Sequence, residues 1–343
     1  MTFHYYFWYL CSMIHEFTQV LLTWYRFNGR ELPWRGTHDP YAIWLSEIIL
    51  QQTRIDQGEA YWHRFMQRFP TVELLAAATE DEVLRLWQGL GYYSRARNLR
   101  AAAQQIVSAG SFPNTLDGLR ALKGIGDYTA AAIGSIAFGL DAAAVDGNVF
   151  RVLARHFGIE TPINTTEGKH EFTALATALL PHGEAGTFNQ ALMDFGALQC
   201  TPQSPQCQLC PLAESCAALH AGRVEELPVK LRTTKVQERH LAYIYIRCQG
   251  QTAIRRRPAG DIWQGLWEPV QMDQVELEGC KAQMLTKDVK HILTHRILYA
   301  DFYYLEANEK PSLPEGYIWV DEAALDNYAK PRLIEKLFKF CPQ

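Results

Sequence analysis

Residues 122–130 read LKGIGDYTA and lie between two stretches with helical periodicity. Gly124 and Gly126, one residue apart, permit a tight hairpin and a close approach of the backbone to another molecule. The N–H groups that open the second helix then face an anion without help from charged side chains. The pattern predicts a helix-hairpin-helix motif, whose N–H groups bind a phosphate of the DNA backbone. An ordinary αα-hairpin with two glycines is the alternative.

The chain on both sides of this hairpin is helical. From about residue 14 to 219, apolar residues recur every three or four positions. From residue 240 onward, this period gives way to aromatic-rich segments in which apolar and polar residues alternate. A final helix is expected at 331–340. The alternation predicts strands at 241–247, 252–256, 297–305 and 317–320.

These patterns divide the chain into segments of different class. We expect an N-terminal extension at 1–12, an all-α domain at 13–220, a linker at 221–239 and a smaller α+β domain at 240–343. The length of 343 residues agrees with about two domains.

The composition is that of a folded protein without a global excess of positive charge. Apolar residues make up 48% and charged residues 20%, which excludes disorder as the main state. The formal net charge is −4, so any binding of DNA has to rest on local motifs. No apolar run is long enough to span a membrane, so we expect a protein of the cytoplasm without membrane contact.

Four of the eight cysteines fall in one short segment. Such clustering is typical of a metal site, not of a disulfide framework, and it agrees with a reducing compartment. Only the central pair has the spacing common in zinc sites, whereas iron–sulfur clusters accept assorted spacings. We therefore predict an iron–sulfur cluster, with structural zinc or plain buried cysteines as alternatives, at Cys200, Cys207, Cys210 and Cys216.

Three motifs together resemble the endonuclease III superfamily of DNA glycosylases: the cysteine spacing, the LKGIG hairpin and VDGNV at 145–149. Within it, WLSEIILQQT at 44–53 and GLGYY at 89–93 are similar to the MutY family of adenine glycosylases. The resemblance covers nearly all of residues 17–216. It implies a 4Fe-4S cluster and a monomeric base excision repair enzyme of the bacterial nucleoid. Its substrate is then double-stranded DNA in which adenine is mispaired with 8-oxoguanine or guanine.

Two carboxyl groups suit the implied reaction. Cleavage of an N-glycosidic bond builds positive charge on the sugar and negative charge on the base, so an acid for the base and a carboxylate for the sugar suffice. The resemblance makes Glu47, at the rim of an apolar helix face, the general acid. It makes Asp146 the residue that stabilises the sugar, with Asn148 orienting it. A surface glutamate and a helix-capping aspartate are the alternatives.

Position 128 distinguishes two reaction types. Relatives that also cut the strand have a lysine there, which attacks the sugar to form a Schiff base. Tyr128 cannot form this adduct, so we predict a monofunctional glycosylase that leaves an abasic site. The resemblance also makes Tyr128 a catalytic residue near the aspartate, where its hydroxyl polarises the intermediate; a tyrosine that packs on the hairpin is the alternative. The competing hypotheses are an endonuclease III-like enzyme with lyase activity and a non-catalytic DNA-binding scaffold.

Other residues gain roles from the resemblance. An enzyme that acts on a base in a duplex must flip it out and fill the gap. Gln52 and Tyr92 are then wedge residues, and Arg35 contacts the flipped adenine. Arg95 and Arg97 are expected to contact phosphates or to lie on a solvated face. The full set expected to bind DNA or substrate is Arg35, Leu50, Gln52, Thr53, Tyr92, Gly124, Gly126, Thr294 and His295.

The C-terminal domain resembles the Nudix-like module with which MutY proteins recognise 8-oxoguanine. It lacks the run of glutamates that binds magnesium in Nudix hydrolases, so we predict recognition without hydrolysis. Where many relatives have a Phe-Ser-His triplet, this chain has Leu293, Thr294 and His295. The hydroxyl and the imidazole are kept, while a leucine replaces the aromatic wedge. A short structural hairpin is the alternative.

Overall fold

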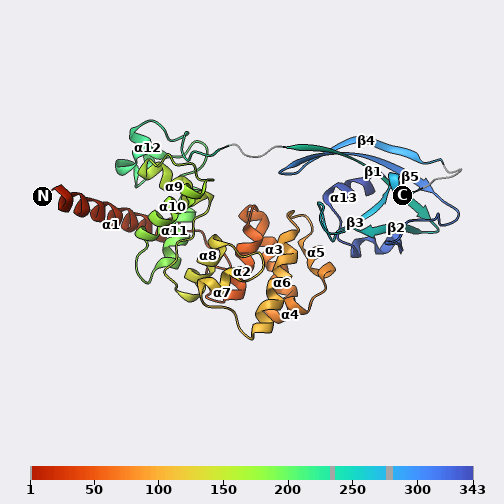
Figure 1. Cartoon of the computed structure of the whole chain (residues 1–343), viewed down its shortest axis with the longest axis horizontal. Coiled ribbons are helices and arrows are strands. Elements are labelled where there is room, and N and C mark those ends of the chain that lie inside the picture. Colours follow the sequence, from red (N-terminus) through yellow and green to blue (C-terminus); the bar gives the residue numbers. More distant parts are fainter. Residues whose placement is uncertain (1, 232–235, 276–280, 343) are drawn as a thin grey trace. The chain divides into compact units, whose positions relative to one another are not determined.

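The computed structural model describes residues 2–231, 236–275 and 281–342 and divides the chain into two compact units (Figure 1). The first consists of Met1–Ala76 with Ala101–Arg232, and the second of Ala77–Arg100 with Thr233–Gln343. A helical segment from the middle of the chain thus belongs to the same unit as the C-terminal strands. No helix among the described residues is long and apolar enough to cross a membrane.

The first unit is helical, and one of its cores joins the N-terminal helix to three consecutive helices later in the chain. These are α1 (Thr2–Asn28), α9 (Gly147–Phe157), α10 (Thr166–Leu179) and α11 (Ala185–Leu198). The remaining helices are α2 (Pro40–Leu50), α3 (Ile55–Arg68), α4 (Val72–Ala77), α7 (Leu116–Arg120), α8 (Asp127–Phe138), α12 (Ala217–His220) and most of α6 (Ser94–Ala109).

Two apolar helices of this unit, α2 and α8, pack against each other. Asp39 caps α2 by accepting the Tyr41 N–H at 3.0 Å, and Pro40 occupies the first helical position. α8 is rich in alanine, so its neighbours can approach closely. At Gly186 of α11, a Cβ would lie 2.8 Å from the carbonyl oxygen of Ser135, so only glycine fits there. This close packing brings α2, α8 and α11 together at one pocket, which α9 also lines.

The second unit contains α5 (Glu80–Trp87) and a six-stranded sheet. Among the described residues the strand order is β4-β5-β1-β3-β2-β6, and only β1 and β5 pair in parallel. The strands are β1 (Gln237–Cys248), β2 (Gln251–Arg256), β3 (Trp267–Gln271), β4 (Gln283–Ile292), β5 (Arg296–Glu306) and β6 (Tyr317–Asp321).

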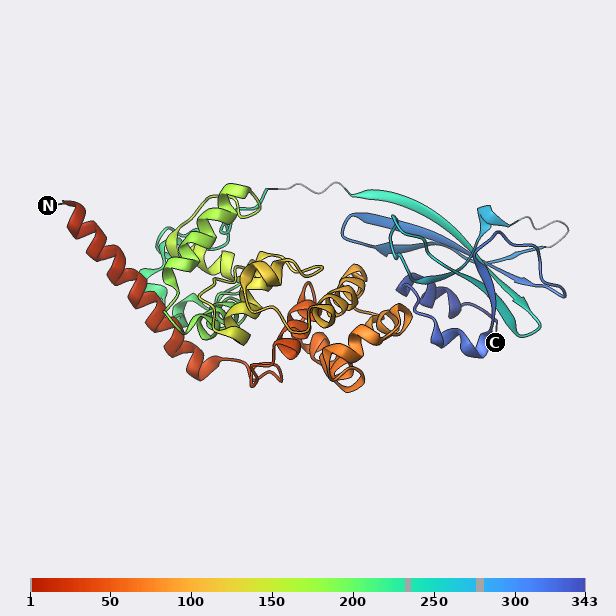
Figure 2. The ribbon, with the colours of Figure 1, turned by 60° about the horizontal axis from the view of Figure 1, so that its bottom comes forward.

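Each face of this sheet has its own apolar core. On one face, α13 (Arg332–Phe338) buries Leu333, Ile334 and Leu337 against Tyr243 and other side chains of β1 and β5. Figure 2 shows this helix, in dark blue, lying along the sheet. Ile244 and Ile246 of β1 belong to the core of the opposite face. The predicted combination of an all-α glycosylase domain with an α+β domain is confirmed, since in the described residues every strand lies beyond Arg232.

Candidate active site

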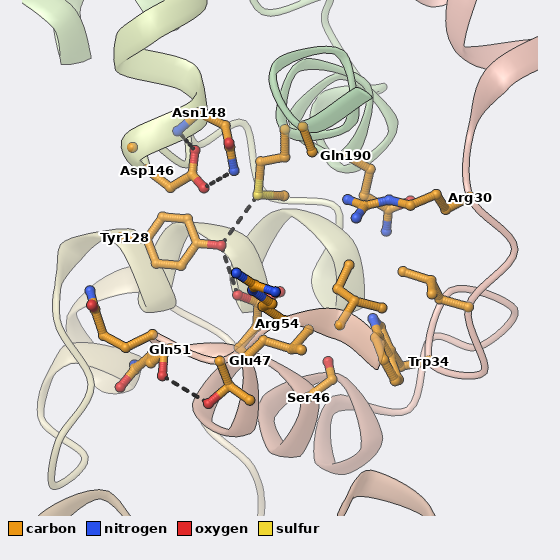
Figure 3. A pocket seen from close by; sticks show the side chains of 18 of the residues that line it. Arg30, Trp34, Ser46, Glu47, Gln51, Arg54, Tyr128, Asp146, Asn148 and Gln190 are labelled. Atoms are coloured by element: carbon orange, nitrogen blue, oxygen red, sulfur yellow. Dashed lines mark hydrogen bonds between the residues drawn. The ribbon is translucent and has the colours of Figure 1, made fainter. Parts of the chain in front are cut away.

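A pocket of about 960 Å³ lies in the first unit where α2, α8, α9 and α11 approach one another (Figure 3). Its walls contain both expected carboxyl groups and a tyrosine, together with arginine and glutamine side chains. The predicted residues that line it are Arg35, Glu47, Leu50, Gln52, Thr53, Tyr128, Asp146 and Asn148. The fold therefore gathers, at one site, residues that the sequence separates by about a hundred positions.

Glu47 is the one charged residue of α2. Its Oε2 accepts a hydrogen bond from the Tyr128 hydroxyl at 2.9 Å, and Figure 3 shows the two side chains pointing toward each other. Burial raises the pKa of Glu47 to about 7, while the Tyr128 hydrogen bond opposes the rise and the charge of Asp146 adds to it. Near neutral pH, a large fraction of Glu47 therefore carries the proton that a general acid needs.

Tyr128 comes from the first turn of α8, directly after the glycine hairpin. Besides its bond to Glu47, its hydroxyl lies 3.2 Å from the sulfur of Met193 on α11. Burial raises the pKa of Tyr128 well above its usual value, and the charges of Glu47 and Asp146 act in the same direction. Tyr128 is therefore a neutral hydrogen-bond donor.

Asp146 is the N-cap residue of α9. Its Oδ1 accepts the backbone N–H groups of Asn148 at 2.9 Å and Val149 at 2.8 Å, and its Oδ2 accepts the side-chain amide of Asn148 at 2.8 Å. Burial raises the pKa of Asp146, and these three hydrogen bonds oppose the rise because they favour the charged form. The capping role, an alternative in the sequence analysis, thus coexists with a place in the pocket wall.

A buried ion pair orients the arginine side of the pocket. Asp194 of α11 is fully buried and accepts hydrogen bonds from Arg35 Nη2 at 2.7 Å and Arg30 Nε at 2.9 Å. Burial alone would raise the pKa of Asp194, but these bonds lower it overall. Of these three residues, only Arg35 is predicted from the sequence, and Arg30 and Asp194 are not. A single aspartate within the apolar stretch ALMDFGAL is the signal that could have revealed Asp194.

Comparison with known proteins agrees with this geometry. Residues 45–177 match the HhH-GPD superfamily base excision DNA repair protein, 242–340 the NUDIX domain, and 200–216 the iron–sulfur binding domain of endonuclease III. The adenine DNA glycosylase of Buchnera aphidicola subsp. Schizaphis graminum is 35% identical over 283 residues, which cover 81% of this chain and 82% of that protein. The chain belongs to the adenine DNA glycosylase family.

Other relatives support this membership. The human adenine DNA glycosylase is 41% identical over 225 residues, which cover 62% of this chain and 41% of the human protein. Among solved structures, a thermostable thymine-DNA glycosylase has a TM-score of 0.58 at 30% identity, covering 62% of this chain and 99% of its own. As a family member, the chain is an adenine DNA glycosylase that hydrolyses N-glycosyl bonds in base excision repair.

The four clustered cysteines of this adenine DNA glycosylase lie around one small cavity, beside the short turns η1 (Cys207–Leu209) and η2 (Ala213–Ser215). Within the described ranges, no three His, Cys, Asp or Glu residues are grouped closely enough to hold a single metal ion. Four cysteines around one cavity suit a polynuclear cluster, which is held by four thiolates. The enzyme carries a 4Fe-4S cluster, and the residues that fit it are Cys200, Cys207, Cys210 and Cys216.

A chain of hydrogen bonds connects the cysteine loop to Asp146. Arg151 donates from Nε to the carbonyl oxygen of Cys200 at 2.8 Å and from Nη2 to Oδ1 of Asn148 at 2.9 Å. Asn148 in turn donates to Asp146. Gly196 of α11 makes room for this arrangement, because a Cβ there would lie 2.7 Å from the Cβ of Asn148. Arg151, which also lines the pocket, thus links Asp146 through Asn148 to the cysteine loop.

Replacing Arg151 by methionine is expected to slow adenine release about 10- to 100-fold, as is typical when a residue supporting a reacting group is removed. Methionine keeps apolar packing but leaves Asn148 without its donor. Single-turnover rates at saturating enzyme measure the effect, and visible absorbance reports whether the cluster is retained. Arg26→Met, at an exposed position of α1, is the control. A rate within twofold of the wild type would show that Arg151 does not orient Asp146.

The glycine hairpin has the expected form. Gly124 has φ +79°, a left-handed conformation that favours glycine, while Leu122 and Ile125 are buried and anchor the turn. A Cβ at Gly126 would meet nothing within 4 Å, so the space at the start of α8 is open. The backbone N–H groups that open α8 are thus available to an anion.

Gln52 lies in the turn that follows α2, between Leu50 and Thr53. The Thr53 N–H donates to the Leu50 carbonyl at 3.1 Å and closes this turn. Gln52 is exposed and has φ +58°, which is uncommon for a residue other than glycine. Backbone strain of this kind tends to occur at functional sites.

In the second unit, Tyr92 lies close to the predicted recognition turn. It is 46% exposed with φ +46°, and its hydroxyl is 2.5 Å from Oγ1 of Thr294. Thr294 and His295 are exposed in the turn from β4 to β5, which the Leu293 N–H closes by donating to the Arg296 carbonyl at 2.8 Å. Two of the predicted residues, Tyr92 and Thr294, thus meet although 202 positions separate them.

Arg95 and Arg97 differ from their expected placement on phosphates or on a solvated face. Arg95 is only 8% exposed, with its guanidinium 5.0 Å from the ring centre of Trp87 and 5.6 Å from that of Tyr92. Burial lowers the pKa of Arg95 to about 10. Arg97 donates to the Gln264 carbonyl at 2.6 Å. Arg95 is buried because cation–π contacts hold its guanidinium beside the rings of Trp87 and Tyr92.

Replacing Arg95 by leucine is expected to weaken binding of duplex DNA up to about tenfold, because cation–π contacts of this strength position Tyr92. Arg95→Lys is expected to recover only part of the affinity, since an ammonium group does not stack as a guanidinium does. Fluorescence anisotropy with labelled duplex measures the change, and Arg85→Leu, on an exposed part of α5, is the control. If Arg95→Leu bound DNA as tightly as the wild type, Arg95 would not be needed to position Tyr92 for binding.

Proposed function

We propose that this enzyme flips adenine out of double-stranded DNA, where adenine is paired with 8-oxoguanine or guanine, and releases it without cutting the strand. The observation that carries the proposal is the pair of unlike carboxyl groups in one pocket. With a pKa of about 7, Glu47 carries its proton in a large fraction of molecules near neutral pH, whereas three hydrogen bonds favour the ionised form of Asp146. Two carboxyl groups with separated roles are what cleavage of a glycosidic bond requires.

The reaction follows from these two groups. Glu47 donates its proton to a ring nitrogen of adenine, and the N-glycosidic bond breaks with its electron pair moving to the base. Positive charge then develops on the sugar, where the Asp146 carboxylate stabilises it by charge or by a transient ester bond. Water adds to the sugar carbon and gives up a proton that restores Glu47. The products are free adenine and an abasic site.

Two observations support hydrolysis without strand cleavage. Tyr128 has no amine with which to attack the sugar. Among the described residues that line the pocket, none is a lysine. A Schiff base, which the lyase reaction requires, has no source at this site.

The binding residues suit a flipped base. The pocket volume of about 960 Å³ lies in the range of small-molecule sites and accommodates a purine nucleotide. In this proposal Arg35 contacts the adenine, Gln52 and Tyr92 fill the gap in the duplex, and the hairpin at 124–126 binds a phosphate. All the reacting groups come from one chain, which agrees with a monomer.

The recognition of 8-oxoguanine is assigned to the turn between β4 and β5. Thr294 offers a hydroxyl donor and acceptor, and His295 an imidazole, at exposed positions. Leu293 contacts the apolar core beneath α13. The C-terminal unit in this proposal recognises the lesion and hydrolyses nothing.

Single-turnover assays on short duplexes test the proposal. Adenine placed opposite 8-oxoguanine or guanine is expected to be released, and the strand to break there only after alkali. Breakage before alkali, with a borohydride-trapped adduct, would favour the lyase alternative. Binding without release of adenine, with Asp146→Asn no slower than the wild type, would favour a non-catalytic scaffold.

A further inference from the structure

The outer side of α13 carries more basic than acidic side chains. Arg332 and Lys336 lie one helical turn apart on the exposed side, opposite the buried Leu333 and Leu337. Lys339, at the end of the helix, is exposed as well. Throughout the described residues, the side chains of these three basic residues form no ion pair and no hydrogen bond within the chain.

Two carboxylates lie beside these residues, fewer than the basic groups around them. Glu335 accepts a hydrogen bond from the side-chain amide of Gln88. Asp326 lies 3.9 Å from Nζ of Lys330, whose ammonium also donates to the Tyr328 carbonyl at 3.0 Å. A depression of about 440 Å³ runs along this surface, and its basic lining residues are Lys330, Arg332, Lys336 and Lys339.

This basic surface continues to the recognition turn. Arg332 also lines the neighbouring pocket, together with Thr294, His295 and Arg296. Arg296 shares its one carboxylate partner, Asp261, with other arginines, so positive charge remains in excess there too. The charges of Lys336 and Arg332 both act on His291 of β4, beside the same turn. A band of positive charge therefore runs from the turn to α13 in a chain of net charge −4.

We propose that Arg332, Lys336 and Lys339 bind phosphate groups of the DNA strand that carries the base held by Thr294 and His295. The inference rests on the proposed function, since it takes the turn between β4 and β5 as the lesion-recognition element. Solvated, unpaired Lys and Arg side chains are the groups with which proteins contact phosphates. Such contacts position a strand without reading its sequence, and they release counterions, which makes their contribution depend on salt.

Salt titration of binding tests this surface. The duplex contains 2′-fluoro-deoxyadenosine opposite 8-oxoguanine, because the fluorine disfavours positive charge on the sugar and the adenine stays attached. For Arg332→Gln/Lys336→Gln, the slope of log K against log salt is expected to be shallower by about 1.8, or about 0.9 for each phosphate that the variant no longer neutralises. Lys336→Gln alone is expected to show about half of this change. Lys310→Gln, which removes one exposed lysine near β6 at the other edge of the sheet, is the matched control.

Neutral methylphosphonate linkages locate the bound phosphates. Placed beside 8-oxoguanine, they are expected to weaken binding by the wild type and to weaken binding by the double variant, which keeps only Lys339 of the three, much less. The inference would be overturned if the salt slope of the double variant equalled that of the wild type. It would also be overturned if Lys310→Gln changed the slope as much as Lys336→Gln does. The wild type is assayed in parallel on cleavable duplex. Absence of adenine release there would count against the proposed function, whatever the slopes show.

Discussion

Asp146→Asn is expected to lower the single-turnover rate of adenine release by about 10³-fold or more, because it removes the one negative charge placed to stabilise the sugar. Asparagine is also a good N-cap residue, so α9 is expected to remain intact. The fold, the cluster and the affinity for DNA should therefore survive while the reaction fails. Quenched-flow or manual sampling with excess enzyme measures the rate.

The matched control for this variant is Asp117→Asn, an aspartate at the start of α7 whose side chain is almost fully exposed. Its rate is expected to equal that of the wild type. If Asp146→Asn retains a rate within tenfold of the wild type, stabilisation of the sugar has to come from another group.

Glu47→Gln is expected to lower the rate about 10²- to 10⁴-fold, the usual contribution of a general acid. The pH profile gives a second, independent readout. Because the pKa of Glu47 is about 7 in the folded enzyme, the wild-type rate under subsaturating conditions should fall as the pH rises above 7. The residual rate of Glu47→Gln should lack this decline. Glu73→Gln, at an exposed position of α4, is the control.

The same pKa predicts the effect of pH on stability. The folded pKa of Glu47 lies above its ordinary value of 4.5, so its protonated form is the one that folding favours. Its contribution is fully present below pH 4.5 and is lost as the pH rises through about 7. Chemical unfolding at several pH values should show the free energy of unfolding decline over this range in the wild type, relative to Glu47→Gln. Parallel profiles for the two proteins would contradict the raised pKa.

The sequence predicts the main elements of the fold because their signals are local. The glycine hairpin, the helical periods and four of the six strands follow from neighbouring residues. The strands β3 and β4 escape prediction for physical reasons. β3 has Pro269 at its centre, which argues against a strand. β4 is an edge strand with few apolar residues and two register shifts, so it lacks a clean alternation.

The candidate site is predictable only where a motif marks it. Glu47 and Asp146 lie in such motifs, and the structure places both in one pocket. Asp194 and Arg151 are held by partners distant in the sequence, so no local pattern reveals their contacts. Arg95 shows the same limit, because the sequence alone does not reveal that Trp87 and Tyr92 lie beside it.

The close approach at Gly196 bears on how inherited variants of such a protein are judged. Adding one methyl group there forces Asn148 to move, since the nearest atoms are its Cβ and backbone. An alanine allele of this kind overpacks the contact between α9 and α11, so it would lower the stability of the protein as well as displace Asn148. Assays of protein abundance alone would therefore understate the damage, and a mutation-frequency assay in living cells would record both effects.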